Sequence, residues 1–136
     1  MRGRLFMSEK IAEEWLEKAE ADLKAAQILY REDGPRGVIC FHAQQAVEKA
    51  LKAILLHVGM GLKKTHSIRE IKALLSASGL NPDISDENCR LLDALYLPSK
   101  YPLGGVLPDS EPDKAICDHC IQVATSVVNW ARMQIK

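Results

Sequence analysis

The sequence lacks the long apolar runs of a membrane protein and any excess of charge of one sign. No segment approaches the roughly 18 apolar residues of a membrane span, and the opening MRGRLFM has no apolar signal-peptide core. Lys plus Arg and Asp plus Glu each total 18, so the formal net charge is +0. A neutral chain has no overall field that attracts nucleic acid or an anionic membrane. We therefore expect a cytoplasmic protein without membrane contact, in which any anion site is local.

Strand-type patterns are also absent. No segment shows a sustained alternation of apolar and polar residues that is rich in β-branched residues, whereas apolar residues recur at the helical spacing of three or four. The 136 residues suit one domain with its own core. The sequence predicts an all-α chain with a single helical domain over residues 8–136, preceded by a flexible extension over residues 1–7.

Two long helices are predicted in the first half of the chain. The first covers residues 8–32, with Ser8 as its N-cap, and stops at the turn over residues 33–35. The second covers residues 36–58 and ends at Gly59. The predicted core side of the first holds Ile11, Trp15, Ala19, Leu23, Ala26 and Tyr30, and that of the second holds Cys40, Ala43, Val47, Ala50, Leu51, Ile54 and Val58.

Three more helices are predicted in the second half. Ser67 and Glu70 have the spacing of a capping box, which begins a short helix ending near residue 78. Ser85 caps a helix over residues 86–97, and Pro112 suits the first turn of a final helix that continues to residue 134. The proline- and glycine-rich segment 98–112 between them is the longest irregular stretch.

Four cysteines raise the question of a metal site. Cys117 and Cys120 flank His119 at metal-like spacing, but a structural zinc needs about four ligands, usually from two such pairs in loops. Here the pair falls inside a predicted helix, and Cys40 and Cys89 stand alone. We therefore expect buried, reduced thiols and neither a metal nor a cofactor.

A polar stripe lies opposite the core side of the second helix. Its members fall within a wedge of roughly 80° and alternate with apolar residues. The polar members are His42, Gln45, Lys49 and Lys52, and the apolar ones are Val38, Phe41 and Leu56. The stripe is either exposed, with Glu48 and Lys52 as an i,i+4 pair, or packed on the third helix, or a ligand or dimer surface.

A basic run precedes the third helix. Lys63, Lys64 and His66 lie just before its start, where cations and the helix N-terminus together favour a phosphate. The alternative is a solvated loop in which the Thr65 or Ser67 hydroxyl only caps the helix.

Four separated motifs, WLEKAEADLKAAQILY, FHAQQAVEKALKAIL, KTHSI and LYLPSKYP, resemble the HEPN family of small prokaryotic domains over about residues 13–135. The resemblance implies an up-and-down bundle of four long helices plus one short helix, commonly a symmetric homodimer. It also implies RNA cleavage, nucleotide binding, or both. Many such proteins are encoded beside a minimal nucleotidyltransferase, and the pair behaves as toxin and antitoxin.

The resemblance also bears on whether the chain cuts RNA. Ribonucleolytic HEPN proteins carry Arg, four to six residues and then His near the start of the last long helix, and this sequence lacks that motif there. Lys100 stands where related proteins often have the Arg, and the next histidine is His119. The one literal match is Arg36 with His42, in which the imidazole would act as acid or base and the cation would steady the phosphorane.

These observations favour a dimeric HEPN-type module that binds nucleotide or RNA phosphates and acts with a nucleotidyltransferase. Its predicted catalytic pair is His42 and Arg36, and its predicted binding residues are Gln45, Lys49, Lys52, Lys64, His66, Lys100 and Tyr101. Tyr101, between two prolines, is either a packing plug or a phenol open to modification by the nucleotidyltransferase. The alternatives are a metal-independent endoribonuclease toxin and a purely structural partner.

Overall fold

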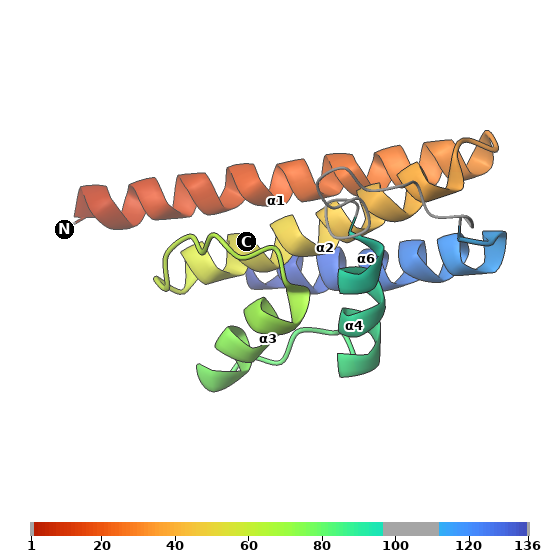
Figure 1. The fold of residues 1–136 in the computed structure, drawn as a ribbon. Helices are drawn as coiled ribbons and strands as arrows, with labels where there is room; N and C mark the ends of the chain where they lie inside the picture. The colour runs from red at the N-terminus through yellow and green to blue at the C-terminus, as the bar shows by residue number, and fades with distance from the viewer. Residues whose placement is uncertain (1, 97–111, 136) are drawn as a thin grey trace, which may run out of the picture.

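The computed structural model describes residues 2–96 and 112–135, and these residues form five helices and no strand (Figure 1). The helices are α1 (Arg2–Arg31), α2 (Arg36–His57), α3 (Ile68–Ala77), α4 (Asp86–Leu95) and α6 (Lys114–Gln134). The all-α prediction is confirmed. Within the described residues, three helices are long and two have 10 residues each, so α4 is as short as α3 rather than a fourth long helix.

Helix α2 is the centre of the bundle. It runs back along α1, α6 packs against both of them, and α3 and α4 pack on α2 and on each other (Figure 1). Thirteen of the 22 residues of α2 are buried, far more than the single face of a surface helix. Because α2 is covered from several sides, its buried polar residues Gln44, Glu48 and Lys52 need partners inside the protein.

Helix α1 differs from the prediction at its start and on its core side. It begins at Arg2, so the predicted start at Ser8 is wrong; Arg4, Leu5 and Met7 are good helix formers and no cap is needed at Ser8. Its buried residues are Ala12, Leu16, Ala19, Leu23 and Ala26. Ile11 is 38% exposed, and Trp15 only packs against the edge of the core. Val58, also predicted as core, is 40% exposed because it lies beyond the end of α2.

The predicted caps of the shorter helices are confirmed. Ser67 Oγ accepts from the backbone N of Glu70 at 3.3 Å, and Ser85 Oγ accepts from that of Asn88 at 3.0 Å. Gly59 and Gly79 follow helix ends with φ of 80° and 91°, a conformation that glycine adopts without strain.

Helix α6 begins at Lys114, two residues later than predicted. Asp113 is the N-cap, and its side chain accepts from the backbone N of Ile116 at 2.8 Å, so Pro112 precedes the helix and is not in its first turn. The rest of the predicted irregular segment, residues 98–111, lies outside the described residues. In the part of the chain that is described, no helix is long and apolar enough to cross a membrane.

Candidate functional site

The first part of the candidate site is a carboxylate on α1 that holds two residues of the predicted stripe. Lys49 Nζ donates to Asp22 Oδ2 at 2.6 Å, and His42 Nδ1 lies 2.9 Å from Asp22 Oδ1. A carboxylate accepts hydrogen bonds, so Nδ1 of His42 donates to Asp22, and Nε2 is the ring nitrogen that is left for another partner. The Asp22 side chain is 13% exposed and those of His42 and Lys49 are 29% and 26% exposed, so the group lies at the surface.

The second part is centred on Glu48, inside α2. Its Oε2 accepts from Lys52 Nζ at 3.0 Å and lies 3.1 Å from His66 Nδ1, while its Oε1 accepts from Gln44 Nε2 at 3.3 Å. Glu48 and Lys52 side chains are each 5% exposed. The predicted pair therefore exists, but as a buried ion pair. Lys52 has left the solvent-facing stripe, and Gln45 reaches the group through Gln44, whose Oε1 accepts from Gln45 Nε2 at 2.7 Å.

Three aromatic rings connect the two parts. His66 and Tyr96 are stacked, with ring centroids 5.2 Å apart and planes 19° apart, and Phe41 is stacked on Tyr96 at 6.4 Å. Phe41 also meets His42 edge-on at 5.9 Å. Burial, and then the charge of Glu48, raise the pKa of the Tyr96 phenol, so it stays neutral. The His66 side chain is 56% exposed and presents an aromatic ring to solvent at the edge of this group.

The N-terminus of α3 is already occupied by a carboxylate. Asp93 of α4 accepts from the backbone N of Ile68 at 2.7 Å and from that of Arg69 at 3.3 Å, and Ser67 Oγ donates to it at 3.0 Å. The Thr65 hydroxyl accepts from the backbone N of Ser67 and donates to Glu70. The predicted phosphate position at this helix end is therefore filled from within the chain, and the hydroxyls cap the helix. Lys63 and Lys64 are exposed in the loop before it.

The predicted pair of Arg36 and His42 does not form a single group. Arg36 is the exposed first residue of α2. Six residues correspond to about 600° of helical rotation, so the two side chains point about 120° apart. His42 is instead paired with Asp22. Of the other candidates, Lys100 and Tyr101 lie outside the described residues.

Lys114 and His119, a cation and an imidazole five positions apart near the start of α6, do not form a pair either. Lys114 Nζ lies 3.7 Å from Asp33 Oδ1 and 5.5 Å from the centre of the Tyr30 ring. His119 Nε2 lies 2.8 Å from Asn88 Oδ1 of α4. Each side chain is directed to a different element, so they do not act together on one ligand.

The cysteines are buried and reduced, as predicted. The Cys40 and Cys117 sulfurs lie 3.7 Å apart where α2 meets α6, and burial raises the pKa of Cys117 to about 12. A neutral thiol is a poor metal ligand and nucleophile. Among the described residues, no group of three or more His, Cys, Asp or Glu side chains is arranged to hold a metal ion.

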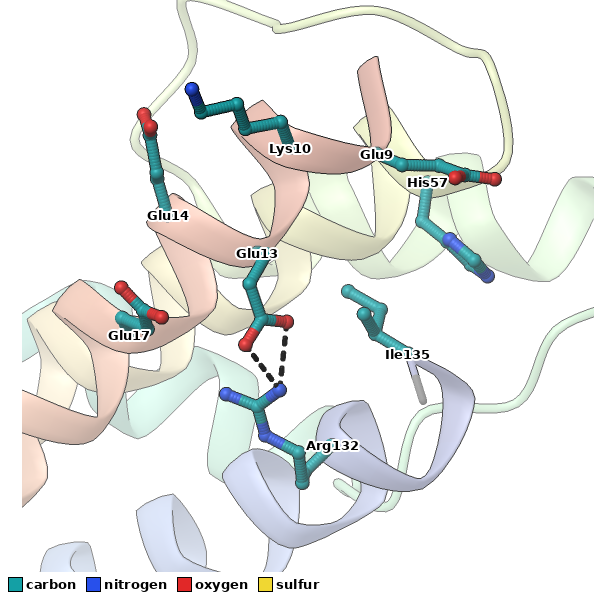
Figure 2. Close-up of a pocket in the computed structure, with 8 residues that line it drawn as sticks. All are labelled: Glu9, Lys10, Glu13, Glu14, Glu17, His57, Arg132 and Ile135. Atoms are coloured by element: carbon teal, nitrogen blue, oxygen red, sulfur yellow. Dashed lines mark hydrogen bonds and ion pairs between the residues drawn. The ribbon is translucent and has the colours of Figure 1, made fainter. Parts of the chain in front are cut away.

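The largest described cavity lies elsewhere, between the N-terminal half of α1 and the ends of α2 and α6 (Figure 2). It has a volume of about 740 Å³ and is lined by Glu9, Lys10, Glu13, Glu14, Glu17, His57, Arg132 and Ile135. Figure 2 shows Arg132 pointing at Glu13, with both carboxylate oxygens within 2.8 Å of Nη1. Glu20 holds the other side of the guanidinium, with Oε1 2.7 Å from Nη2. The ion pairs of Arg132 with Glu13 and Glu20 hold α6 against α1. Because the arginine is already paired, we do not assign an anion site to this cavity.

Sequence reasoning missed Asp22 and underestimated Gln44 and Glu48. Asp22 lies three residues after Ala19 and four before Ala26, both buried, so helical spacing places its carboxylate at the edge of the core side of α1. Gln44, Glu48 and Lys52 follow one another at i,i+4 spacing. In both cases the sequence contained the information, because a polar residue stands at helical spacing from residues on the core side of its helix.

The fold and site together define an all-helical bundle whose central helix carries a partly buried polar cluster. The sequence matches the family model of the HEPN domain over residues 12–134, and the chain belongs to this family. It is similar to the crystal structure of ST0689, an archaeal HEPN homologue, with 30% identity, a TM-score of 0.69, and coverage of 92% of this chain and 98% of that one.

A second similar structure is TT1696 from Thermus thermophilus. It has 27% identity and a TM-score of 0.69, and the match covers 90% of this chain and 96% of that one. No match was found among curated proteins. The predicted family and its helical fold are therefore confirmed.

Proposed function

We propose that this HEPN chain is a dimeric binding module that holds the phosphates of a nucleotide or of RNA on the α2 face and acts with a nucleotidyltransferase partner in a toxin-antitoxin system. The observation that carries the binding proposal is the exposed His66 ring, stacked on Tyr96 beside a cluster of cations. Aromatic rings that stack bases, together with cations that meet phosphates, form the usual surface for single-stranded nucleic acid.

The charge balance of the cluster supports an anionic ligand. Asp22 and Glu48 hold Lys49 and Lys52, which leaves the four charges balanced. Lys63 and Lys64, exposed in the loop that leads to His66, add two positive charges at the rim. A phosphate at this rim would meet cations that are not already neutralised by the two carboxylates.

Dimer formation and a protein partner are supported by exposed apolar side chains at one end of the bundle. Ile11, Val58, Leu62 and Met133 are 38%, 40%, 51% and 70% exposed and belong to the part of the fold where the start of α1 meets the ends of α2 and α6. We assign the interface to this end of the bundle because surfaces that another protein covers carry exposed apolar side chains. HEPN proteins that resemble this chain commonly form homodimers and accompany a nucleotidyltransferase.

The binding proposal is tested by titrating a labelled single-stranded RNA, and separately ATP, with the full chain. His66→Ala should weaken binding about tenfold, since stacking on an aromatic ring contributes roughly 1–3 kcal/mol per base. His66→Phe keeps the ring and should retain most of the affinity. Lys24→Ala, exposed on the outer side of α1, is the matched control. Unchanged affinity in His66→Ala would remove the basis of the proposal and favour the purely structural partner.

A metal-independent endoribonuclease is the second candidate, because one specific contact favours it. Asp22 holds Nδ1 of His42, which directs Nε2 outward as an acid or base, and Lys49 on the same carboxylate supplies a cation for the phosphorane. If this interpretation is right, the protein cuts RNA in the presence of chelator and His42→Ala does not. Cleavage that persists in His42→Ala, or no cleavage by a folded wild-type protein, would reject it.

A further inference from the structure

A second cationic site lies between the two short helices. A pocket of about 180 Å³ is lined by Arg69, Lys72, Ala73, Ser76, Asp86 and Arg90. Arg69 and Lys72 are three residues apart on α3, and Asp86 and Arg90 are four apart on α4, so each pair shares one helix face. The packing of α3 on α4 brings the two faces together.

The electrostatics of this pocket favour an anion. Lys72 Nζ donates to Asp86 Oδ1 at 2.9 Å. The bond from Lys72 holds the pKa of Asp86 below its usual range, and the charges of Arg90 and Arg69 lower it further. Lys72, Arg69 and Arg90 therefore all lie close enough to Asp86 to stabilise its negative charge. Asp86 is the only carboxylate among the described lining residues, so the pocket has two positive charges in excess.

The shape of the pocket suits a compact oxyanion. The side chains of Ala73 and Ser76 are small, which leaves room between the charged groups, and the volume of about 180 Å³ corresponds to roughly six water molecules. Arg69 and Arg90 come from different helices and are both exposed. Because both line the same pocket, two guanidinium groups are available there, and each can donate two hydrogen bonds to a phosphate.

We propose that the pocket between α3 and α4 binds a phosphate group, and that in the working protein this phosphate belongs to the RNA strand whose base stacks on His66. The second half of this inference rests on the proposed function. His66 and Arg69 are three residues apart, so their Cα atoms are separated by at most about 11 Å. A short oligonucleotide that stacks on His66 therefore reaches the pocket.

The experiment has two arms, both with the full chain. The first measures the affinity of a fluorescein-labelled ten-nucleotide single-stranded RNA for the wild type, for Arg69→Gln with Arg90→Gln, and for Asp86→Asn. The second adds inorganic pyrophosphate and follows the arginine side-chain signals by NMR. The replaced side chains are exposed, so the variants should keep the wild-type melting temperature. The charge-matched control for the double arginine variant is Lys18→Gln with Lys24→Gln, at two exposed positions of α1.

The arginine variant should bind RNA at least about tenfold more weakly, and the slope of log Kd against log salt should fall by about 0.7, since it loses one phosphate contact on a single strand. Asp86→Asn removes the competing carboxylate and should tighten binding about threefold. Pyrophosphate should shift the Arg69 and Arg90 signals in the wild type.

The outcomes separate this inference from the proposed function. RNA binding that is lost in His66→Ala but unchanged in the arginine variant overturns the pocket and leaves the proposed function standing. Pyrophosphate shifts without any RNA binding support the phosphate pocket and overturn the RNA function. The absence of both RNA binding and pyrophosphate shifts overturns both.

Discussion

Replacing Lys52 with methionine should destabilise the protein by about 3 kcal/mol. The side chains of Lys52 and Glu48 are each 5% exposed, and their charged atoms are 3.0 Å apart. Removing one partner of a buried ion pair typically costs about 3–5 kcal/mol, because the other charge stays buried without compensation. Gln44 and His66 still contact Glu48 in the variant, so we expect the lower end of that range.

The double variant Glu48→Gln with Lys52→Met separates the loss of stability caused by an unpaired buried charge from the loss caused by altered packing. It removes both charges and keeps side chains of similar size, so it should recover to within about 1 kcal/mol of the wild type. Lys24→Met makes the same chemical change at an exposed position and should cost less than about 0.5 kcal/mol.

Urea unfolding followed by circular dichroism measures these differences. With an m-value of about 2 kcal/mol/M, a loss of 3 kcal/mol lowers the midpoint by about 1.5 M. A shift below about 0.5 M for Lys52→Met would mean that Glu48 is not a buried charge that depends on Lys52. A double variant as unstable as the single one would assign the cost to packing.

Three further predictions concern other contacts. Arg132→Lys should lower the free energy of unfolding by about 1 kcal/mol, and most strongly at low salt, because lysine has no planar guanidinium to bind both Glu13 and Glu20. Urea unfolding at two salt concentrations measures this loss. An equal loss at both concentrations would contradict the prediction. Asp93→Ala should cost about 1–2 kcal/mol, since it removes the acceptor at the start of α3, and faster amide exchange at Ile68 and Arg69 is the local readout. Burial raises the pKa of Cys89 from its ordinary value of 9.0 to about 11, so the unfolded thiol ionises first and stability should fall as the pH rises from 9 to 11. Cys89→Ala should make that part of the pH profile less steep, with the remaining slope due to Cys117, whose pKa is raised to about 12, and an unchanged slope would contradict the assignment.

The ends of the helices were predictable from the sequence because they depend on neighbouring residues. Ser67, Ser85, Gly59 and Gly79 act within three or four positions of themselves, and a local pattern contains the whole interaction. The start of α6 was misjudged by a similar local choice, in which Asp113 caps the helix and Pro112 stands before it. The family motifs likewise predicted the fold, since they keep their order along the chain.

The stripe on α2 shows where sequence reasoning ends. Helical periodicity placed His42, Lys49 and Lys52 on one side of the helix, but in the structure Lys52 is buried while His42 and Lys49 are partly exposed. Which of them meets solvent depends on what covers it. Lys49 and His42 meet Asp22, 27 and 20 positions earlier in the chain, and Glu48, the partner of Lys52, also meets His66, 18 positions later.

The sequence by itself determined the helical class, most helix ends and the family, because these follow from local hydrogen bonding and apolar spacing. Only the tertiary structure decided that Lys52 is buried, that Asp93 fills the N-terminus of α3, and that Arg69, Lys72 and Arg90 share one pocket. The physical reason is that the free energy of a charge depends on its distance to other charges and to water, and packing between distant segments sets both distances.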